Sequence, residues 1–154
     1  MKRLLLLLAA HLALPLLGAD APRGYDDGAT ADPTAELQGA WYSTSTGYGG
    51  ARYPGVDKAN RHVIRGDRWV YTDGAAVVQA GTLRVIRGGR QLVRVDFVVT
   101  EGFRKGDTWL AVYERRGDEL TWCGGYAGDG RARPAALATK ADDGYNFRTL
   151  RREK

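Results

Sequence analysis

Side chains able to perform covalent chemistry are few in this chain of 154 residues. It has one cysteine, Cys123, two histidines, and two serines, Ser43 and Ser45. A cysteine nucleophile needs a base, and His62 is the only histidine outside the N-terminal apolar run. Because cysteine is among the most buried residue types, we predict a packed structural thiol. We likewise predict that His62 lies in the core or at its rim.

Metal and carboxylate chemistry have equally thin support. A zinc site needs three or four Cys, His or carboxylate ligands, more than this pool supplies. Asp129-Gly130 and Asp142-Asp143 lack the spacing of a calcium loop and are expected to be solvated acids. Glu114, Asp96 and Glu101 form an acid–base pair only if they converge in a cavity. We therefore predict no metal, no cofactor and no enzymatic activity.

A group of aromatic residues is the one candidate ligand-binding site that the sequence pattern indicates. They lie at alternating positions of adjacent predicted strands. In a barrel they either line a small-ligand cavity at the mouth or simply fill the interior. Filling is the commoner role, and it is the favoured one here. The candidates for ligand binding are Trp69, Tyr71, Trp109, Tyr113 and Trp122.

These side chains must be positioned by strands. From Leu37 onward apolar and polar residues alternate with a period of two, and glycines punctuate the pattern. Gly66-Asp67, Asp73-Gly74, Gly88-Gly89 and Gly117-Asp118 suit hairpin turns. The predicted strands are Gly39–Thr46, Arg61–Arg65, Arg68–Thr72, Val77–Ile86, Gln91–Thr100, Thr108–Arg115, Glu119–Gly124 and Tyr145–Arg151.

Eight short strands joined mainly by tight turns predict an all-β, antiparallel up-and-down meander. Such a meander closes readily into a barrel, which removes exposed strand edges. A two-residue turn at Gly66-Asp67 opposes Ile64 to Trp69 and His62 to Tyr71, one coherent apolar and aromatic face.

Two further turns set the register of later strands. The Gly117-Asp118 turn opposes Tyr113 to Trp122 and leaves open which face of these strands points inward. Between the fourth and fifth strands we predict a three-residue loop, Gly88-Gly89-Arg90. That loop aligns Val85 with Val93 and Leu83 with Val95.

The N-terminus has the layout of a secretory signal peptide. Lys2 and Arg3 precede an apolar run that ends in small residues, and we predict cleavage after Ala19. The run of about 14 residues is short of the roughly 20 that span a bilayer, so an uncleaved anchor is the weaker alternative. Residues 20–35 are expected to be a flexible leader, and 36–154 the domain. The protein is thus expected to be secreted or periplasmic, without stable membrane insertion after cleavage.

Several short segments of the sequence, called landmarks here, resemble in order and spacing those of a family of small exported proteins abundant in planctomycetes, whose function is uncharacterised. The resemblance covers about residues 36–152. This chain departs from the family at Trp122, where a short aliphatic residue is usual, at Ala111, where Gly is usual, and in its own segment Gly47–Gly55. The landmarks are Glu36–Trp41, Ile64–Trp69, Ala80–Leu83, Val95–Phe97, Lys105–Thr108, Ala111–Glu114, Gly117–Cys123, Arg133-Pro134 and a basic C-terminal end after Phe147.

The resemblance implies a lipocalin-like, calycin-type barrel, and Gly39-x-Trp41 matches the opening of such barrels. In them a Trp near the start of the first strand packs under an Arg beyond the last strand. Arg151 or Arg152 would be that Arg here, and the contact would close one barrel end.

The leading hypothesis is therefore an exported, non-catalytic barrel that binds a small apolar molecule. The alternative is a cell-envelope interaction module that binds a partner protein or glycan through Gly47–Gly55 and Ala127–Ala141. A cavity below about 300 Å³ would favour the alternative, since ligand pockets are usually larger. The net charge of +5, which loss of Lys2 and Arg3 lowers, is too small to predict nucleic-acid binding.

Overall fold

The computed structural model describes residues 34–86 and 92–154. Its described part is an all-β structure with two short 3₁₀ helices, η1 (Ala35–Leu37) and η2 (Ala127–Asp129). The strands are β1 (Gly39–Tyr48), β2 (Ala51–Arg65), β3 (Arg68–Asp73), β4 (Ala76–Ile86), β5 (Val93–Gly102), β6 (Thr108–Arg116), β7 (Glu119–Tyr126) and β8 (Asn146–Arg152). The predicted leader and signal peptide, apart from Thr34 and Ala35, lie outside the described residues.

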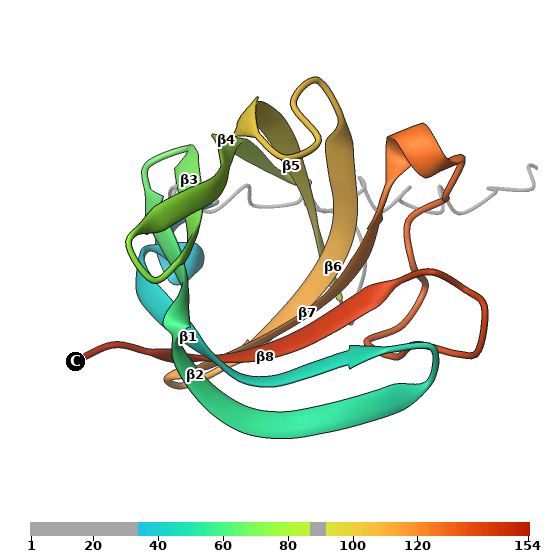
Figure 1. Cartoon of the computed structure of the whole chain (residues 1–154), viewed down its shortest axis with the longest axis horizontal. Helices are drawn as coiled ribbons and strands as arrows, with labels where there is room; N and C mark the ends of the chain where they lie inside the picture. Colours follow the sequence, from blue (N-terminus) through green and yellow to red (C-terminus); the bar gives the residue numbers. More distant parts are fainter. Residues whose placement is uncertain (1–33, 87–91) are drawn as a thin grey trace, which may run out of the picture.

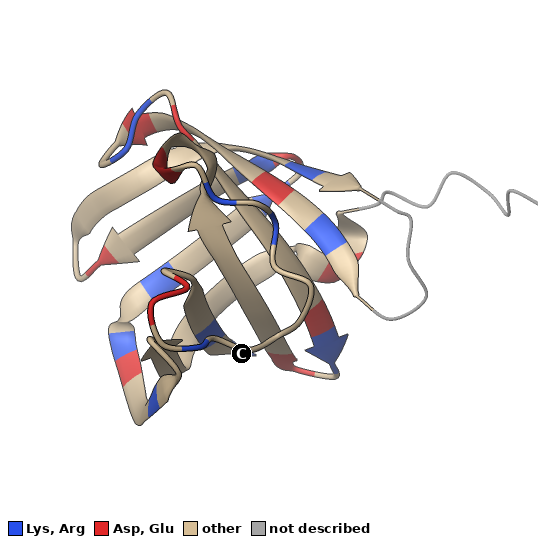
Figure 2. Cartoon of the chain, turned by 90° about the vertical axis from the view of Figure 1, so that its right-hand side faces the viewer, with Lys and Arg blue, Asp and Glu red and all other residues tan. Residues whose placement is uncertain are grey.

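The strands form a closed barrel in which each pairs with its neighbour in sequence and β1 pairs with β8. All of these pairings are antiparallel. The predicted all-β meander that closes into an eight-stranded barrel is confirmed (Figure 1). Figure 2 shows basic and acidic residues interleaved over the strands and turns in view.

Two predicted registers are confirmed. His62 lies opposite Tyr71 across the Gly66-Asp67 turn, and Tyr113 lies opposite Trp122 across the Gly117-Asp118 turn. Both turns start with a glycine at positive φ, 60° for Gly66 and 61° for Gly117, as two-residue hairpin turns require.

The predicted β4–β5 register is wrong. Val85 pairs with Val95 and Leu83 with Phe97, so β5 is displaced by two residues from the predicted alignment. An even displacement keeps every apolar side chain on the same face, so alternation alone did not separate the two registers. The predicted loop Gly88-Gly89-Arg90 itself lies outside the described residues.

Strand β2 is much longer than predicted, and the segment Gly47–Gly55 is not a loop. It forms the tip of the β1–β2 hairpin, with Tyr48 paired to Ala51 across Gly49 and Gly50. These glycines have φ of 58° and 80°, which continues the hairpin through a tight turn. The β3–β4 turn also lies one residue later than predicted, because Asp73 pairs with Ala76. The other predicted strand bounds within the described residues differ by at most two residues.

The core has two parts, and they settle which face of β6 and β7 points inward. The main cluster fills the barrel and includes Ala111, Tyr113, Leu120 and Trp122. A smaller cluster of Val112, Cys123 and Phe147 lies on the opposite strand face and packs against Leu92, Leu137 and Tyr145. The face with Trp122 is therefore the interior one.

One end of the barrel is closed by η1 and the start of β1. Leu37 is fully buried, and its carbonyl accepts a hydrogen bond of 2.8 Å from Nε1 of Trp41. Arg152 places its guanidinium carbon 4.6 Å from the centre of the Trp41 ring. Of the two arginines predicted for this contact, Arg152 makes it, while Arg151 is exposed. Thr34 is also buried, so the packed structure begins within the predicted leader.

Candidate functional site

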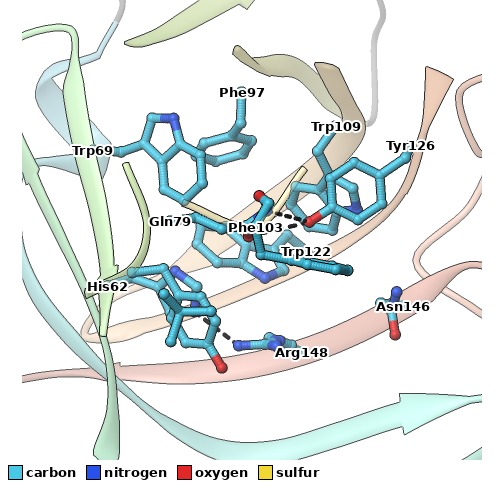
Figure 3. A pocket seen from close by; sticks show the side chains of 12 residues that line it. His62, Trp69, Gln79, Phe97, Phe103, Trp109, Trp122, Tyr126, Asn146 and Arg148 are labelled. Carbon is cyan, nitrogen blue, oxygen red and sulfur yellow. Dashed lines mark hydrogen bonds between the residues drawn. The ribbon is translucent and has the colours of Figure 1, made fainter. Parts of the chain in front are cut away.

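A cavity of about 240 Å³ lies inside the barrel, at the end opposite η1. Seven of the strands and the β5–β6 turn contribute to its wall (Figure 3). Aromatic rings make up most of the lining, and a few polar groups complete it. The lining residues are His62, Trp69, Tyr71, Val78, Gln79, Phe97, Phe103, Trp109, Trp122, Tyr126, Asn146 and Arg148.

Four of the five aromatic residues predicted as candidates line this cavity: Trp69, Tyr71, Trp109 and Trp122. Tyr113 does not, which corrects that prediction. It is buried at the closed end of the barrel, where its hydroxyl donates to the Glu36 carboxylate. Alternation places a residue on the inner face but says nothing about its depth along the barrel axis.

The aromatic wall is a network of edge-to-face contacts. Trp122 lies at its centre, with ring centroids 5.3 Å from Phe97 and 5.7 Å from Trp109. Trp69 meets Phe97 edge to face at 5.2 Å. Such pairs fix the orientation of the rings. The rings therefore fill the middle of the barrel, which is the favoured role, and also form the wall of the cavity next to it.

Gly124 makes room for one of these rings. A Cβ atom at this position would lie 2.6 Å from Cε2 of Trp109 and 2.8 Å from Cβ of Ala111. Any larger residue there would displace the indole of Trp109. The glycine is therefore needed for the shape of the aromatic wall.

The polar side of the cavity is organised around Arg148. Its Nη1 donates to Oδ1 of Asn60 at 2.8 Å and lies 3.0 Å from Nε2 of His62. The guanidinium carbon is 4.7 Å from the centre of the Tyr71 ring, and His62 stacks on the same ring at 4.6 Å. Asn60 is oriented in turn, because its amide donates to the Tyr71 hydroxyl at 2.7 Å and its Oδ1 accepts from Ser43 at 3.1 Å.

His62 is a neutral acceptor in this arrangement. Burial lowers the pKa of His62 well below its usual range, and the neighbouring charge of Arg148 lowers it further. Because the guanidinium only donates, Nε2 of His62 must accept and the ring proton must reside on Nδ1. The predicted core or rim histidine is thus a buried residue that holds an arginine.

The opposite wall is tied to the rim. Nε2 of Gln79 donates to the Phe103 carbonyl at 2.6 Å and to the Tyr126 hydroxyl at 2.8 Å. Arg104 stacks on the Tyr126 ring at 4.8 Å and pairs with Asp129 at 2.6 Å. The β5–β6 turn is therefore fixed to η2, while the Phe103 side chain remains 63% exposed at the rim.

The remaining candidates for chemistry lie apart from the cavity. Cys123 is buried in the smaller core cluster, as predicted, and burial raises the pKa of its thiol to about 11. Asp96 pairs with Arg84 and Arg133, Glu101 with Arg68, and Glu114 with Arg116, so these carboxylates do not converge. Within residues 34–86 and 92–154, no group of three or more His, Cys, Asp and Glu has the arrangement of a metal site.

Arg148 is the cavity residue that sequence reasoning missed most clearly. It was counted as part of a basic C-terminal end, although Leu150, two residues later, is fully buried. With a period of two, a buried Leu150 places Arg148 and Asn146 on the interior face as well. An arginine on the inner face of a barrel strand was the signal that could have identified Arg148 as a candidate cavity residue.

No known family model, no curated protein and no solved structure matches this chain. Membership in the exported family that the landmarks resemble therefore stays a prediction. Among the described residues, no helix is long and apolar enough to cross a membrane.

Proposed function

We propose that this protein is an exported, non-catalytic barrel that binds a compact, largely apolar molecule in its cavity. The observation that carries the proposal is the aromatic cavity of about 240 Å³ with a few oriented polar groups. A concave apolar site with a small number of placed polar groups is the usual form of a small-molecule site.

The volume restricts what can bind. Typical sites for drug-sized ligands start at roughly 300 Å³, so a long-chain or multi-ring ligand is disfavoured. An apolar cavity of roughly 150 Å³ suffices for benzene. A cavity of about 240 Å³ therefore suits a single ring with a small substituent.

Native mass spectrometry of the mature protein from its own cells tests the proposal, together with an NMR titration by toluene. We expect a discrete added mass, and toluene shifts of the indole signals of Trp109 and Trp122 but not of Trp41 at the closed end. Val78→Trp narrows the cavity and should abolish both effects. Val77→Trp is the matched control, since the Val77 side chain is 56% exposed and does not line the cavity.

An interaction module is a second candidate, and the small cavity volume favours it by the criterion stated above. A specific surface supports it as well: Tyr48 and Tyr53 stack at 5.0 Å on the hairpin tip and are 57% and 47% exposed. Exposed aromatic pairs of this kind are common anchors in protein interfaces. A bare polypeptide mass and no response to single-ring compounds would favour this candidate, and Tyr53→Ser should then weaken partner binding.

A further inference from the structure

Among the described residues that line the cavity, Arg148 is the one that carries a formal charge, because the others include no Asp, Glu or Lys and His62 is neutral. The arginine is half-buried. Among the described residues no carboxylate lies within ion-pair distance of its guanidinium. Removing a charge from water without a counter-charge is costly. An anion that enters the cavity would supply the counter-charge that the described residues do not.

The guanidinium of Arg148 is hydrogen-bonded through only one of its three nitrogen atoms in the described structure. Both of its hydrogen bonds, to Asn60 and His62, use Nη1. The N–H groups of Nη2 and Nε make no hydrogen bond to the described residues. Nε and Nη2 form the edge of the guanidinium that donates two parallel hydrogen bonds to a carboxylate. Stacking on Tyr71 and the contact with neutral His62 fix the plane in which that edge lies.

A second donor without an acceptor belongs to the same wall. Trp122 is 1% exposed, and its Nε1 has no hydrogen-bond partner in the described structure. Its ring is 4.7 Å from that of His62, the residue that contacts Arg148. Figure 3 shows the nitrogen of Trp122 on the side of its indole nearer Arg148. A buried donor without an acceptor is uncommon in folded proteins, and an anion on this side of the cavity would supply the acceptor.

Apolar surface surrounds these donors. Phe97, Trp109 and Trp69 form the wall beside Trp122, and Phe103 lies at the rim. An inorganic ion would leave these rings uncovered, whereas the ring of an aromatic carboxylate would pack between them. Shape and charge therefore select the same class of molecule.

We infer that the molecule bound in this cavity is a small aromatic carboxylate, whose carboxylate pairs with the Nε–Nη2 edge of Arg148 while its ring packs against the tryptophans. The inference rests on the proposed function and names the ligand class of that same site. Asn60 is a positioning residue, because it does not line the cavity and acts on the ligand through Arg148, whereas His62 both holds Arg148 and lines the cavity.

Binding of benzoate, benzamide and acetate to the mature protein tests the inference, measured by calorimetry and by NMR of the indole N–H groups. Benzoate should bind at least about tenfold more tightly than neutral benzamide, since hydrogen bonds to charged groups are the stronger ones. Acetate, which lacks the ring, should bind more weakly than benzoate. The N–H signal of Trp122 should move downfield with benzoate, and that of Trp41 should not move.

Two variants separate charge from packing. Arg148→Met should weaken benzoate binding at least about tenfold and leave benzamide binding nearly unchanged. Arg148→Lys keeps the charge without the planar fork and should give an intermediate affinity. Arg151→Met is the matched control, because Arg151 is an exposed arginine of the same strand. Circular dichroism and the melting temperature verify that each variant folds.

The outcomes distinguish this inference from the proposal on which it rests. If toluene and benzamide bind as well as benzoate does, and Arg148→Met changes nothing, the cavity binds rings and the carboxylate inference is overturned. If none of the ring compounds binds, the proposed function fails and the inference fails with it.

Discussion

Strand β8 carries two arginines on its inner face, and each lies over an aromatic ring. Arg152 is 4.6 Å from the ring centre of Trp41 at the closed end of the barrel, and Arg148 is 4.7 Å from that of Tyr71 in the cavity. Neither has a carboxylate partner among the described residues. Their surroundings differ in one respect: Arg148 is oriented by two hydrogen bonds, whereas the Nε of Arg152 is buried without any.

We interpret the difference between the two arginines as one between a packing role and the proposed role in ligand recognition. Arg152 closes the barrel by covering the face of Trp41, a role that needs its bulk and charge but no fixed orientation of its donors. Arg148 is fixed by Asn60 and His62, which are themselves buried or hydrogen-bonded to further residues. Such supporting contacts around a single polar group are what a binding site requires. The closed end thus serves stability, and the other end carries the proposed site.

The largest expected effect comes from removing the ring at the closed end. Trp41→Ala deletes a side chain with 0% exposure and should lower the free energy of unfolding by about 3–5 kcal/mol. Urea denaturation followed by circular dichroism measures this loss. The free energy of ligand binding should change far less, provided that the measurement is made where the variant is folded.

Truncation of a cavity ring sharpens the comparison. Trp109→Ala removes an equally large side chain that is only partly buried, so its cost should be smaller than that of Trp41→Ala. It should instead weaken the binding of single-ring compounds. Equal costs for the two variants would mean that the two ends of the barrel do not divide stability and binding between them.

A further expected effect is a dependence of stability on pH that originates at the cavity. Unfolded His62 takes up a proton below about pH 6.5, whereas the folded residue, buried beside Arg148 and Tyr71, stays neutral to a much lower pH. The unfolded state therefore binds more protons than the folded state on acidification. The contribution of His62 to stability should be constant above that pH and should fall below it, with a slope of up to about 1.4 kcal/mol per pH unit for one proton.

Replacement of the histidine isolates this contribution. His62→Gln replaces the Nε2 acceptor with an amide oxygen, which can accept from Arg148 but does not titrate, so stability should become nearly independent of pH between about 5 and 6.5. Urea midpoints at a series of pH values provide the measurement. An unchanged acid slope in this variant would show that another group causes the loss.

The fold was more predictable than the site, for reasons visible in single residues. Glycine turns at Gly66 and Gly117 permit one register each, so the pairs that follow them were correctly predicted. The β4–β5 register was not, because displacement by two residues leaves Val85 and Leu83 facing the same core. Sequence patterns thus specify which face a residue occupies better than how far along the barrel it lies.

The same limit explains the errors at the site. Tyr113 shares an inner face with Trp109 but lies at the other end of β6, so it was wrongly grouped with the cavity residues. Arg148 was counted with the basic C-terminal end and not as an inner-face residue, although it alternates with Leu150, which is fully buried. A conflict between charge and period on one strand was informative, and it marks the residue on which recognition is proposed to depend.

The smallest expected effect tests the two arginines directly against each other. Arg152→Met removes the cation over Trp41 and should lower the free energy of unfolding by about 0.5–2 kcal/mol. Arg148→Met removes a cation–π contact as well, and in addition the hydrogen bonds from Nη1 to Asn60 and His62. Both substitutions relieve the partial burial of a cation without a carboxylate partner, so this gain is common to the two variants. Its cost should therefore be higher than that of Arg152→Met, because two hydrogen bonds are lost in addition to the cation–π contact. Denaturation of both variants in parallel, without added ligand, gives the two values, and an equal or lower cost for Arg148→Met would show that its hydrogen bonds to Asn60 and His62 do not stabilise the folded protein.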